Sequence, residues 1–241
     1  KTTYTLHIGK EISGERRAAL SQDTDIQFST LPAAEYVYIA HRSSNSISRY
    51  AMNFTTGTLN LLGAYDNASV YPNEAAAGNL IFNNLTSIVK ASQGPWIYTS
   101  SGDGPSVQAL AVSKQGELTA LTDRGTGAVL NYPVQDRPFI ATAHPSKPYL
   151  YVPSSTRDQV LPLTSYIHVF ETKQDGSLTE IKPFASDPKD GSPNVINTGT
   201  NYPSITKLHP SGEFLFISDF AGSVISVYQI DLHTGHLCEL E

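Results

Sequence analysis

The sequence predicts an all-β fold made of repeated four-stranded antiparallel sheets. Three observations lead to this prediction. β-forming runs that open on aromatic residues begin four times, at Tyr36, Trp96, Tyr149 and Phe214. Their starts are 60, 53 and 65 residues apart (96−36, 149−96, 214−149), the length of four strands with their loops. Each run leads into alternating residues rich in Tyr, Val, Ile and Thr and then a Gly-bearing turn. Sheets repeated in this way are typical of the blades of a β-propeller.

Residues 203–241 show the repeat most clearly. We expect strands over 205–209, 214–218, 224–230 and 237–240. The segment Pro210-Ser-Gly-Glu213 separates the first two strands, and Leu232-His-Thr-Gly235 precedes the last one. Pro fixes φ for one turn, and Gly permits the positive φ that closes the other. The result is a four-stranded antiparallel meander.

The same pattern predicts further blades over residues 26–64, 79–122 and 138–182. Residues 4–9 form one strand of another blade, and the polar stretch after them is a loop or carries a short helix at Glu15–Leu20. Residues 1–241 then form a single propeller domain of four blades and a fragment. Because propellers close with about four to eight blades, either the fragment is completed into a fifth blade or the ring continues beyond these residues.

Composition and charge limit the class of protein. With 241 residues, 39% of them hydrophobic and 16% charged, the chain is long and apolar enough for one sizeable core. The net charge of −6 and the lack of any basic cluster longer than Arg16-Arg17 argue against a nucleic-acid partner. No apolar run approaches the roughly 18 to 20 residues that cross a bilayer, so we expect no membrane span.

Cys238 is the one cysteine of the chain, so an internal disulfide is excluded, and its alternating apolar surroundings predict a small buried side chain. Asn53, Asn67 and Asn84 each begin an Asn-x-Ser/Thr triplet, the acceptor sequence for N-glycosylation. Together with a first residue that is not Met, these triplets favour a secreted or cell-surface protein. A cytoplasmic location stays open, because such triplets also arise by chance in a chain rich in Ser, Thr and Asn.

Several strings resemble the signature of the lactonase-type seven-bladed propellers, which include bacterial 6-phosphogluconolactonases and fungal carboxy-cis,cis-muconate cyclases. The strings are His209-Pro-Ser-Gly-Glu-Phe-Leu-Phe-Ile-Ser, Ser223-Val-Ile-Ser-Val-Tyr-Gln-Ile-Asp-Leu-His-Thr-Gly-His-Leu, Tyr4-Thr-Leu-His-Ile-Gly9 and Ser44-Asn-Ser-Ile-Ser-Arg-Tyr50. The resemblance implies a lactone hydrolase or a lactonizing isomerase (cyclase) that acts on a small carboxylated lactone or its open-chain acid. It also makes this chain about two blades short. We expect no cofactor and no metal.

The chain departs from this family at the position of a catalytic arginine. In the cyclases that residue directly follows the Pro that opens a first strand, but here Phe139 follows Pro138 and Ser204 follows Pro203. The family's catalytic charge therefore does not carry over to either position. The chain also lacks a Gly-x-Ser-x-Gly elbow, a Gly-rich phosphate loop and a His-Glu-x-x-His motif, which argues against serine-hydrolase, nucleotide and zincin chemistry.

Propeller geometry predicts where chemistry can lie. Loops between blades and loops between second and third strands emerge on one face, around the mouth of the central channel. There we expect Arg137 to hold an anion through its planar fork of donors, and His41 or Asp219 to move protons. The other expected binding residues of this face are Asp136, Arg42, Arg157, Asn201 and Tyr202. The plainer alternatives are an inter-blade salt bridge for Arg137 and a structural role for His41.

Two functions remain open from the sequence. One is a lactonase-like or cyclase-like enzyme, and the other is a non-catalytic secreted propeller glycoprotein that binds a glycan or a protein at the channel mouth. Residues 154–165 and 187–201 are long connections of the kind that form a lid or a binding loop, although a disordered excursion is equally admissible. The opposite face holds residues that we interpret as turn structure: His144, Ser146, His209, Ser211, Thr234 and Gly235. The oligomeric state is left open.

Overall fold

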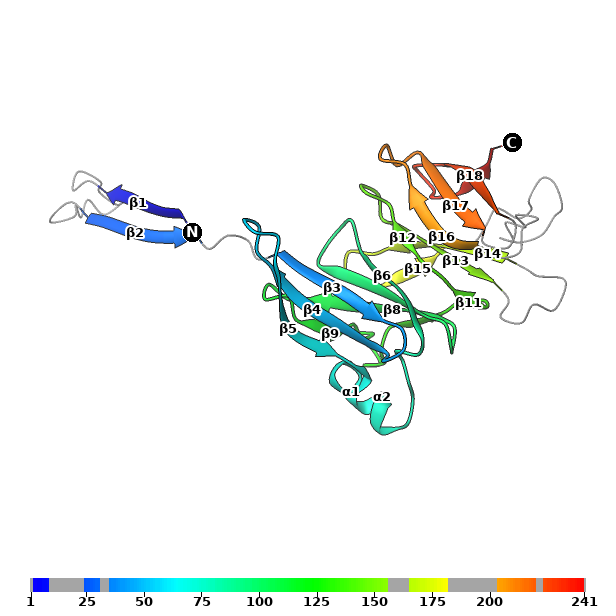
Figure 1. Cartoon of the computed structure of the whole chain (residues 1–241), viewed down its shortest axis with the longest axis horizontal. Coiled ribbons are helices and arrows are strands. Elements are labelled where there is room, and N and C mark those ends of the chain that lie inside the picture. Colours follow the sequence, from blue (N-terminus) through cyan, green and yellow to red (C-terminus); the bar gives the residue numbers. More distant parts are fainter. Residues whose placement is uncertain are drawn as a thin grey trace. The chain divides into compact units, whose positions relative to one another are not determined.

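The computed structural model describes residues 2–8, 24–30, 35–155, 165–181, 203–219 and 223–240 (Figure 1). The chain divides into two compact units. One unit comprises Lys1–Val37 with Ala51–Asn60, and the other comprises Tyr38–Tyr50 with Leu61–Glu241. The predicted helix at Glu15–Leu20 lies outside the described residues.

The first unit contains an antiparallel strand pair, β1 (Thr2–Ile8) with β2 (Thr24–Thr30). The sequence pattern had assigned most of β2 to the blade over residues 26–64. Instead β2 pairs with β1, while β3 (Glu35–His41), β4 (Ser46–Met52) and β5 (Leu59–Tyr65) form a three-stranded sheet, here called the first sheet. Alternation specifies that a run is a strand but leaves its hydrogen-bonding neighbour unspecified.

Three further antiparallel sheets follow in the order of the chain (Figure 1). The second sheet contains β6 (Leu85–Lys90), β7 (Trp96–Ser101), β8 (Ser106–Val112), β9 (Leu118–Ala120) and β10 (Asn131–Pro133). The third contains β11 (Arg137–Pro138), β12 (Thr142–Ala143), β13 (Tyr149–Ser155), β14 (Ser165–Thr172) and β15 (Leu178–Glu180). The fourth contains β16 (Pro203–Leu208), β17 (Phe214–Asp219), β18 (Val224–Ile230) and β19 (Leu237–Glu239).

The predicted all-β propeller class is confirmed. The second, third and fourth sheets are meanders with four successive strand positions, which we call layers and count from the inner strand to the outer one. β9 and β10 both pair with β8 and share the outer layer of the second sheet, while β11 and β12 both pair with β13 and share the inner layer of the third. Two short helices, α1 (Asn67–Val70) and α2 (Pro72–Ala76), were not predicted. Asp66 caps α1 by accepting the Ser69 amide, and Pro72 opens α2.

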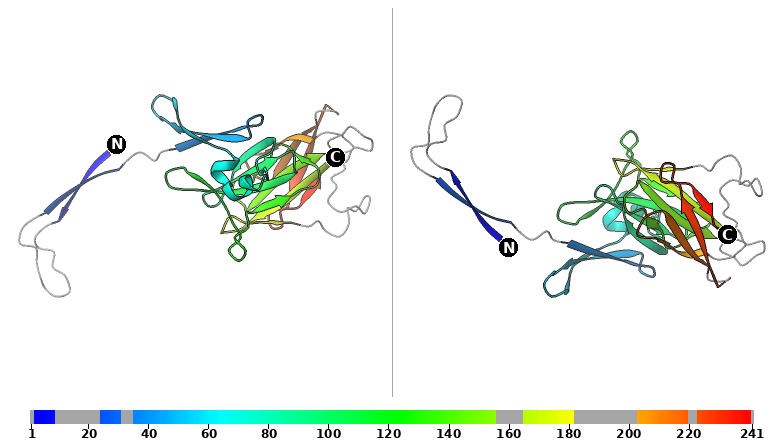
Figure 2. Two further views of the ribbon diagram at one scale, coloured as in Figure 1. Left: turned by 90° about the horizontal axis from the view of Figure 1, so that it is seen from below. Right: turned by 90° about the horizontal axis from the view of Figure 1, so that it is seen from above.

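The inner layers of the last three sheets lie side by side (Figures 1 and 2). Ile140 of the third sheet forms a parallel bridge with Ile205 of the fourth, and the Thr206 hydroxyl donates to the Ile140 carbonyl at 2.8 Å. Toward the second sheet, the Ala141 amide donates to Ser87 Oγ at 3.1 Å. Parallel neighbouring inner strands are the radial arrangement that a propeller requires, because each sheet presents the same edge to one axis.

Consecutive sheets pack face to face through three buried apolar clusters. We call the face of a sheet that contacts the following sheet its forward face, and the opposite one its backward face. Between the first and second sheets, Ile47 packs with Ile97 and Leu110. Between the second and third sheets, Tyr98 and Val107 pack with Leu150 and Val152. Between the third and fourth sheets, Tyr151 and Ile167 pack with Leu215 and Ile217, and in each case the forward-face residues are named first. Each interface is therefore a forward face on a backward face.

A tyrosine hydroxyl repeats at the same place in each of these interfaces. Tyr38 donates to the Gly116 carbonyl at 2.7 Å, Tyr98 to that of Gly176 at 3.0 Å, and Tyr151 to that of Gly235 at 3.3 Å. Each acceptor lies in the turn between the third and fourth layers of the next sheet. At Gly176 the backbone has φ +85° and an added Cβ would lie 2.6 Å from Leu121, so only glycine fits this turn.

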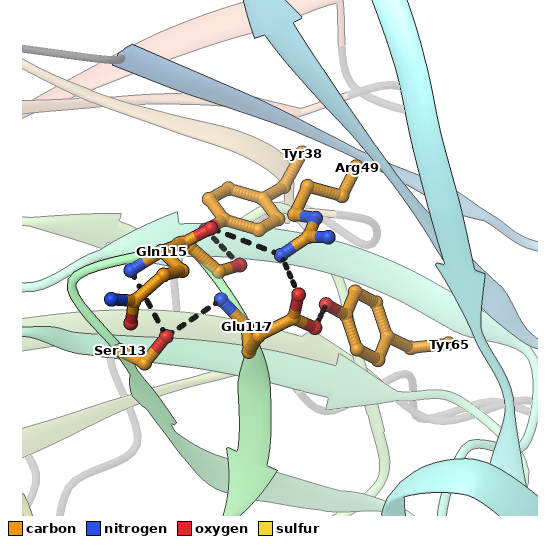
Figure 3. Close-up of polar contacts among 7 residues, drawn as sticks. Tyr38, Arg49, Tyr65, Ser113, Gln115 and Glu117 are labelled. Atoms are coloured by element: carbon orange, nitrogen blue, oxygen red, sulfur yellow. Dashed lines mark hydrogen bonds and ion pairs between the residues drawn. The ribbon is translucent and has the colours of Figure 1, made fainter.

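The interface between the first and second sheets adds an ion pair (Figure 3). Arg49, which is 8% exposed, contacts Glu117 at 2.6 Å, donates to the Gln115 carbonyl at 3.1 Å and lies over the Tyr65 ring. The Tyr65 hydroxyl donates to the other oxygen of the Glu117 carboxylate. The bond from Tyr65, followed by that from Arg49, lowers the pKa of Glu117 below its ordinary value.

The opposite face contains turn structure, as the sequence indicated. Nδ1 of His144 accepts the amides of Ser146 and Lys147, so its Nε2 carries the proton and donates to the Gly212 carbonyl at 3.0 Å. Burial lowers the pKa of His144, which keeps the ring neutral. The prediction of a buried Cys238 is wrong, because β19 is an edge strand and the thiol is exposed.

Replacing Tyr98 by Phe should lower the free energy of unfolding by about 1 kcal/mol, because the buried Gly176 carbonyl loses its donor while the aromatic packing is kept. Chemical denaturation measures the change. Tyr50→Phe is the matched control, since the Tyr50 hydroxyl has no hydrogen bond among the described residues. Equal losses in the two variants would show that the Tyr98 hydroxyl does not join the sheets.

Glu117→Gln should reduce the acid sensitivity of stability. A carboxyl whose folded pKa is lowered stabilises the protein above its unfolded pKa, near 4.5, and this stabilisation disappears as the pH falls through the folded value. The stability gap between the wild type and Glu117→Gln should therefore be largest above about pH 5 and close in acid. Denaturation at several pH values measures it, and a gap that stays constant with pH would contradict the role of Glu117.

Candidate functional site

Asn84 forms hydrogen bonds to a loop of the first sheet and to a loop of the second sheet, on the face where the channel mouth is expected. Its side-chain Oδ1 accepts Arg42 Nε at 2.5 Å, and its backbone amide donates to Asn45 Oδ1 at 2.6 Å. Its carbonyl accepts the Gly102 amide at 2.9 Å, directly after β7. Asn84 has φ +60°, a conformation that Asn adopts more readily than most residues. Asn84 thus connects the predicted binding residue Arg42 with Gly102, and we call the surface that these three residues form the rim.

Arg137 lies across Gly102 on the same rim. An added Cβ on Gly102 would lie 2.8 Å from Nε of Arg137 and 3.3 Å from the Thr86 methyl, so the guanidinium occupies the space that a side chain at position 102 would fill. Nε and Nη2 of Arg137 are buried and have no hydrogen-bond partner among the described residues. These two nitrogens form one edge of the guanidinium, the edge that holds a carboxylate or a phosphate through two parallel hydrogen bonds.

The backbone on either side of Arg137 determines where this residue lies relative to the third sheet. Asp136 has φ +58°, and Pro138 follows Arg137 in the short strand β11, which pairs with the end of β13. Ser154 and Ser155, the register partners of Pro138 and Arg137, have buried hydroxyls without a hydrogen-bond partner in the described part of the chain. Burial raises the pKa of the Asp136 carboxyl, an effect that nearby His168 partly offsets. Incompletely paired polar groups therefore gather where β11 meets β13.

His168 belongs to the same region and was missed by sequence reasoning. Its Nδ1 lies 2.7 Å from Glu180 Oε1, and its Nε2 accepts the Gln135 amide at 3.2 Å, so Nδ1 carries the proton that is donated to Glu180. The amide side chain of Gln135 also donates to the Tyr166 hydroxyl at 2.7 Å. These bonds hold the segment that leads into Asp136 and Arg137. The only sequence signal was a histidine within the third-layer strand of a repeat.

The two expected proton carriers come from other sheets. His41 ends β3, and its Nε2 lies 2.8 Å from Ser48 Oγ on β4. Asp219 ends β17, is 6% exposed and lies opposite Pro203 in the sheet register. His41, Ser101, Ser154 and Asp219 occupy the same position at the ends of the second-layer strands, so the repeat places all four at one level of the sheets.

The other predicted residues separate into three groups. Arg157, Asn201 and Tyr202 lie outside the described residues, as do 156–164 of the first long connection and all of the second, 187–201. Asn67 is 8% exposed, and its amide both donates to and accepts from the Phe82 backbone, so a glycan there would break two buried hydrogen bonds. Asn53 is exposed in a turn. In the described part of the chain, no three His, Cys, Asp or Glu side chains gather as metal ligands would, and no helix has the length and apolarity to cross a membrane.

Comparison with solved structures shows proteins of similar fold. The chain is similar to a protein from Lactobacillus plantarum, with 16% identity and a TM-score of 0.55 over 82% of this chain and 48% of that one. It is also similar to a functionally unknown protein from Desulfotomaculum acetoxidans, with 15% identity and a TM-score of 0.54 over 94% of this chain and 62% of that one. A periplasmic gluconolactonase from Pseudomonas aeruginosa matches at 15% identity with a TM-score of 0.47, over 86% and 66% of the two chains.

These likenesses concern the fold. The chain spans about half the length of the Lactobacillus plantarum protein and 62% of the Desulfotomaculum acetoxidans protein. No model of a protein family matches the chain, and no curated protein matches it either. The class that the fold defines is an all-β propeller, and the chemistry of the rim has to be argued from its own residues.

Proposed function

We propose that this propeller binds a small carboxylated lactone, or the open-chain acid that corresponds to it, at the rim around Arg137. The observation that carries the proposal is the Nε–Nη2 edge of Arg137, which has no hydrogen-bond partner in the part of the chain that the structure describes. A buried donor without a partner costs about 1–3 kcal/mol, and more when it is charged. A carboxylate that bridges both nitrogens removes this cost and gains two charge-assisted hydrogen bonds, which makes the edge a carboxylate-binding feature.

The plainer sequence alternative for Arg137 was a salt bridge between blades. In the described residues Arg137 forms no ion pair with Asp136, its neighbour in sequence, or with the acidic groups of the second sheet. Gly102 supports the binding role, because its lack of a side chain leaves the guanidinium room to lie flat on the rim. An arginine that served only to hold two sheets together would be expected to have its buried donors paired.

The catalytic part of the proposal assigns proton transfer to His41 or Asp219. Ring opening needs a group that takes a proton from water as it attacks the carbonyl, and a group that protonates the departing ring oxygen. A histidine ring nitrogen can accept a proton, and His41 lies at the end of β3, while Asp219 lies at the equivalent level of the fourth sheet. Both roles follow from the position of the two residues on the expected channel-mouth face and from their side-chain chemistry, and they are kept distinct from binding at Arg137.

The non-catalytic alternative, a secreted glycoprotein, rests on Asn53. Its triplet lies in an exposed turn, where an attached glycan would be solvated, whereas the Asn67 amide is committed to Phe82. A glycoprotein of this kind would use the same rim for a glycan or a protein. Ligand binding without turnover is the result that favours it over the enzyme.

Replacing Arg137 by Ala should weaken binding of γ-carboxy-γ-butyrolactone and of 2-hydroxyglutarate, its open-chain acid, by about 10- to 100-fold. The affinity of Arg137→Lys should lie between those of the wild type and Arg137→Ala, because lysine keeps the charge but cannot form the two parallel hydrogen bonds of a guanidinium. Gly102→Ala should weaken binding as well, since its Cβ would displace Nε of Arg137. Isothermal titration calorimetry gives the dissociation constants, and uncharged γ-butyrolactone measures what remains without the carboxylate.

Arg124→Ala is the matched control, because Arg124 is an exposed arginine on the loop between β9 and β10. Its affinity should equal that of the wild type, and an unchanged affinity in Arg137→Ala would overturn the proposed site. In a lactone hydrolysis assay, His41→Gln or Asp219→Asn should lower kcat with little change in affinity. If neither variant changes a measurable rate, the assignment of proton transfer fails while the binding proposal stands.

A further inference from the structure

The hydroxyl of Ser154 is buried beside the rim and has no hydrogen-bond partner in the described part of the chain. Ser154 is 0% exposed, so bulk water does not reach it. A hydroxyl both donates and accepts hydrogen bonds, and leaving it unpaired inside a protein is unfavourable. Such a group in a packed structure points to a partner that the chain itself does not supply.

The repeat provides a direct comparison for Ser154. Ser101 occupies the same position in the second sheet, and its hydroxyl donates to the Ile81 carbonyl at 2.9 Å. His41 occupies this position in the first sheet, and its Nε2 lies 2.8 Å from Ser48 Oγ. Both counterparts have a bond within the chain, whereas Ser154 has none among the described residues. The lack of a bond is therefore no general property of this position.

Alternation along β13 places this hydroxyl between the second and third sheets, which belong to one compact unit. Val152 packs against the second sheet, and Ser154 is the next residue on the same side of the strand. The register partner of Ser154 is Pro138. β11, which contains both Pro138 and Arg137, contacts β7 of the second sheet. Ser154 thus lies next to the strand that carries Arg137 and faces β7, which Gly102 follows.

Two incompletely paired groups therefore lie at the same end of one contact between sheets. Nε and Nη2 of Arg137 are buried without a partner among the residues that the structure describes, and the guanidinium covers Gly102. Ser154 extends from the neighbouring strand toward the same sheet. Arg137 as a whole is half-buried, so the rim reaches solvent at this residue. A ligand that enters here can meet both the guanidinium edge and the hydroxyl.

We propose that Ser154 binds the oxygen on the carbon next to the carboxylate of the ligand, while Arg137 binds the carboxylate itself. This inference rests on the proposed function, because it adds a second contact at the same rim. In the lactone this atom is the ring oxygen, and in the open-chain acid it is a hydroxyl that can both donate and accept. A carboxylate oxygen only accepts, so it would leave the serine oxygen without a donor. Ser154 thus selects 2-hydroxy acids over acids that lack the hydroxyl.

The test compares two acids that differ by this hydroxyl, 2-hydroxyglutarate and glutarate. Isothermal titration calorimetry gives the dissociation constant of each acid with the full chain and with its Ser154→Ala variant. The variant should bind 2-hydroxyglutarate about 5- to 10-fold more weakly, because the ligand hydroxyl loses its partner, and bind glutarate within about twofold of the wild type. Equal losses for both acids, or no loss for either, would overturn the assignment of Ser154.

Stability provides a second readout, because the loss of a paired hydroxyl and the loss of an unpaired one differ in sign. Without ligand, Ser154→Ala should be at least as stable as the wild type, since it removes a buried group that has no partner among the described residues. Ser101→Ala is the matched control. It should lose stability, because the Ile81 carbonyl loses its donor, but keep the wild-type ratio of the two affinities. Chemical denaturation measures both changes, and a clearly destabilised Ser154→Ala would contradict the proposal.

The Arg137→Ala variant separates the role of Ser154 from the proposed function. Arg137→Ala should weaken the binding of both acids, because both carry the carboxylate that the guanidinium holds. If it does so while Ser154→Ala changes neither affinity, the carboxylate site stands and the role of Ser154 is wrong. If neither acid binds to the wild type, the proposed function and the role of Ser154 both fail.

Discussion

The structure depends on the burial of one apolar sheet face against the next. A single four-stranded meander exposes both of its faces, and burial of apolar surface contributes roughly 25 cal/mol for each Å² removed from water. Ile47, Val107 and Ile167 illustrate the rule, because each is fully or nearly buried only where a following sheet covers it. The tyrosine bonds to turn carbonyls add direction to this otherwise non-directional attraction, since each fixes the height of one sheet against the next.

The rim follows from this packing. Because the sheets stand side by side, the loops after β3 and β7 and the segment before β11 meet, and Asn84 connects Arg42 with Gly102 and the place of Arg137. The edge of Arg137 that has no partner among the described residues has a cost in stability, and the sheets on both sides hold it in place. A buried charge that lacks a partner in a well-packed protein is a reason to look for a ligand that supplies one.

Alternation and turn residues were enough to predict most strands of the last three sheets, because apolar periodicity reports directly which runs are pleated. β10 lies outside the blade predicted over residues 79–122, and the inner layer of the third sheet consists of the two short strands β11 and β12. Alternation and turn residues could not predict which faces are covered. Cys238 alternates like a buried residue, yet it lies on an edge strand, and Ile225 has the pattern of a core residue but is exposed. The helices α1 and α2 are too short to show a helical period.

The candidate site could likewise be predicted only in part. Arg137 was predicted because propeller loops gather on one face, but its contact with Gly102 depends on a fold that brings distant segments together. The bonds of His168 to Gln135 and Glu180 depend on strand register and on an inter-sheet connection, and neither can be seen in a single sequence. The positive φ of Asp136 left no local signal beyond the residue's tolerance for that conformation.

The central claim is that neighbouring sheets place their inner strands parallel around a common axis. The bridge between Ile140 and Ile205 is the most direct place to measure it, because both side chains are about 40% exposed and tolerate replacement. In a Cys238→Ser background, Ile140→Cys combined with Ile205→Cys should form a disulfide within one molecule under mild oxidation, identified by mass spectrometry of the linked peptides. Thiols that stay reduced, or that link only between molecules, would contradict the radial arrangement.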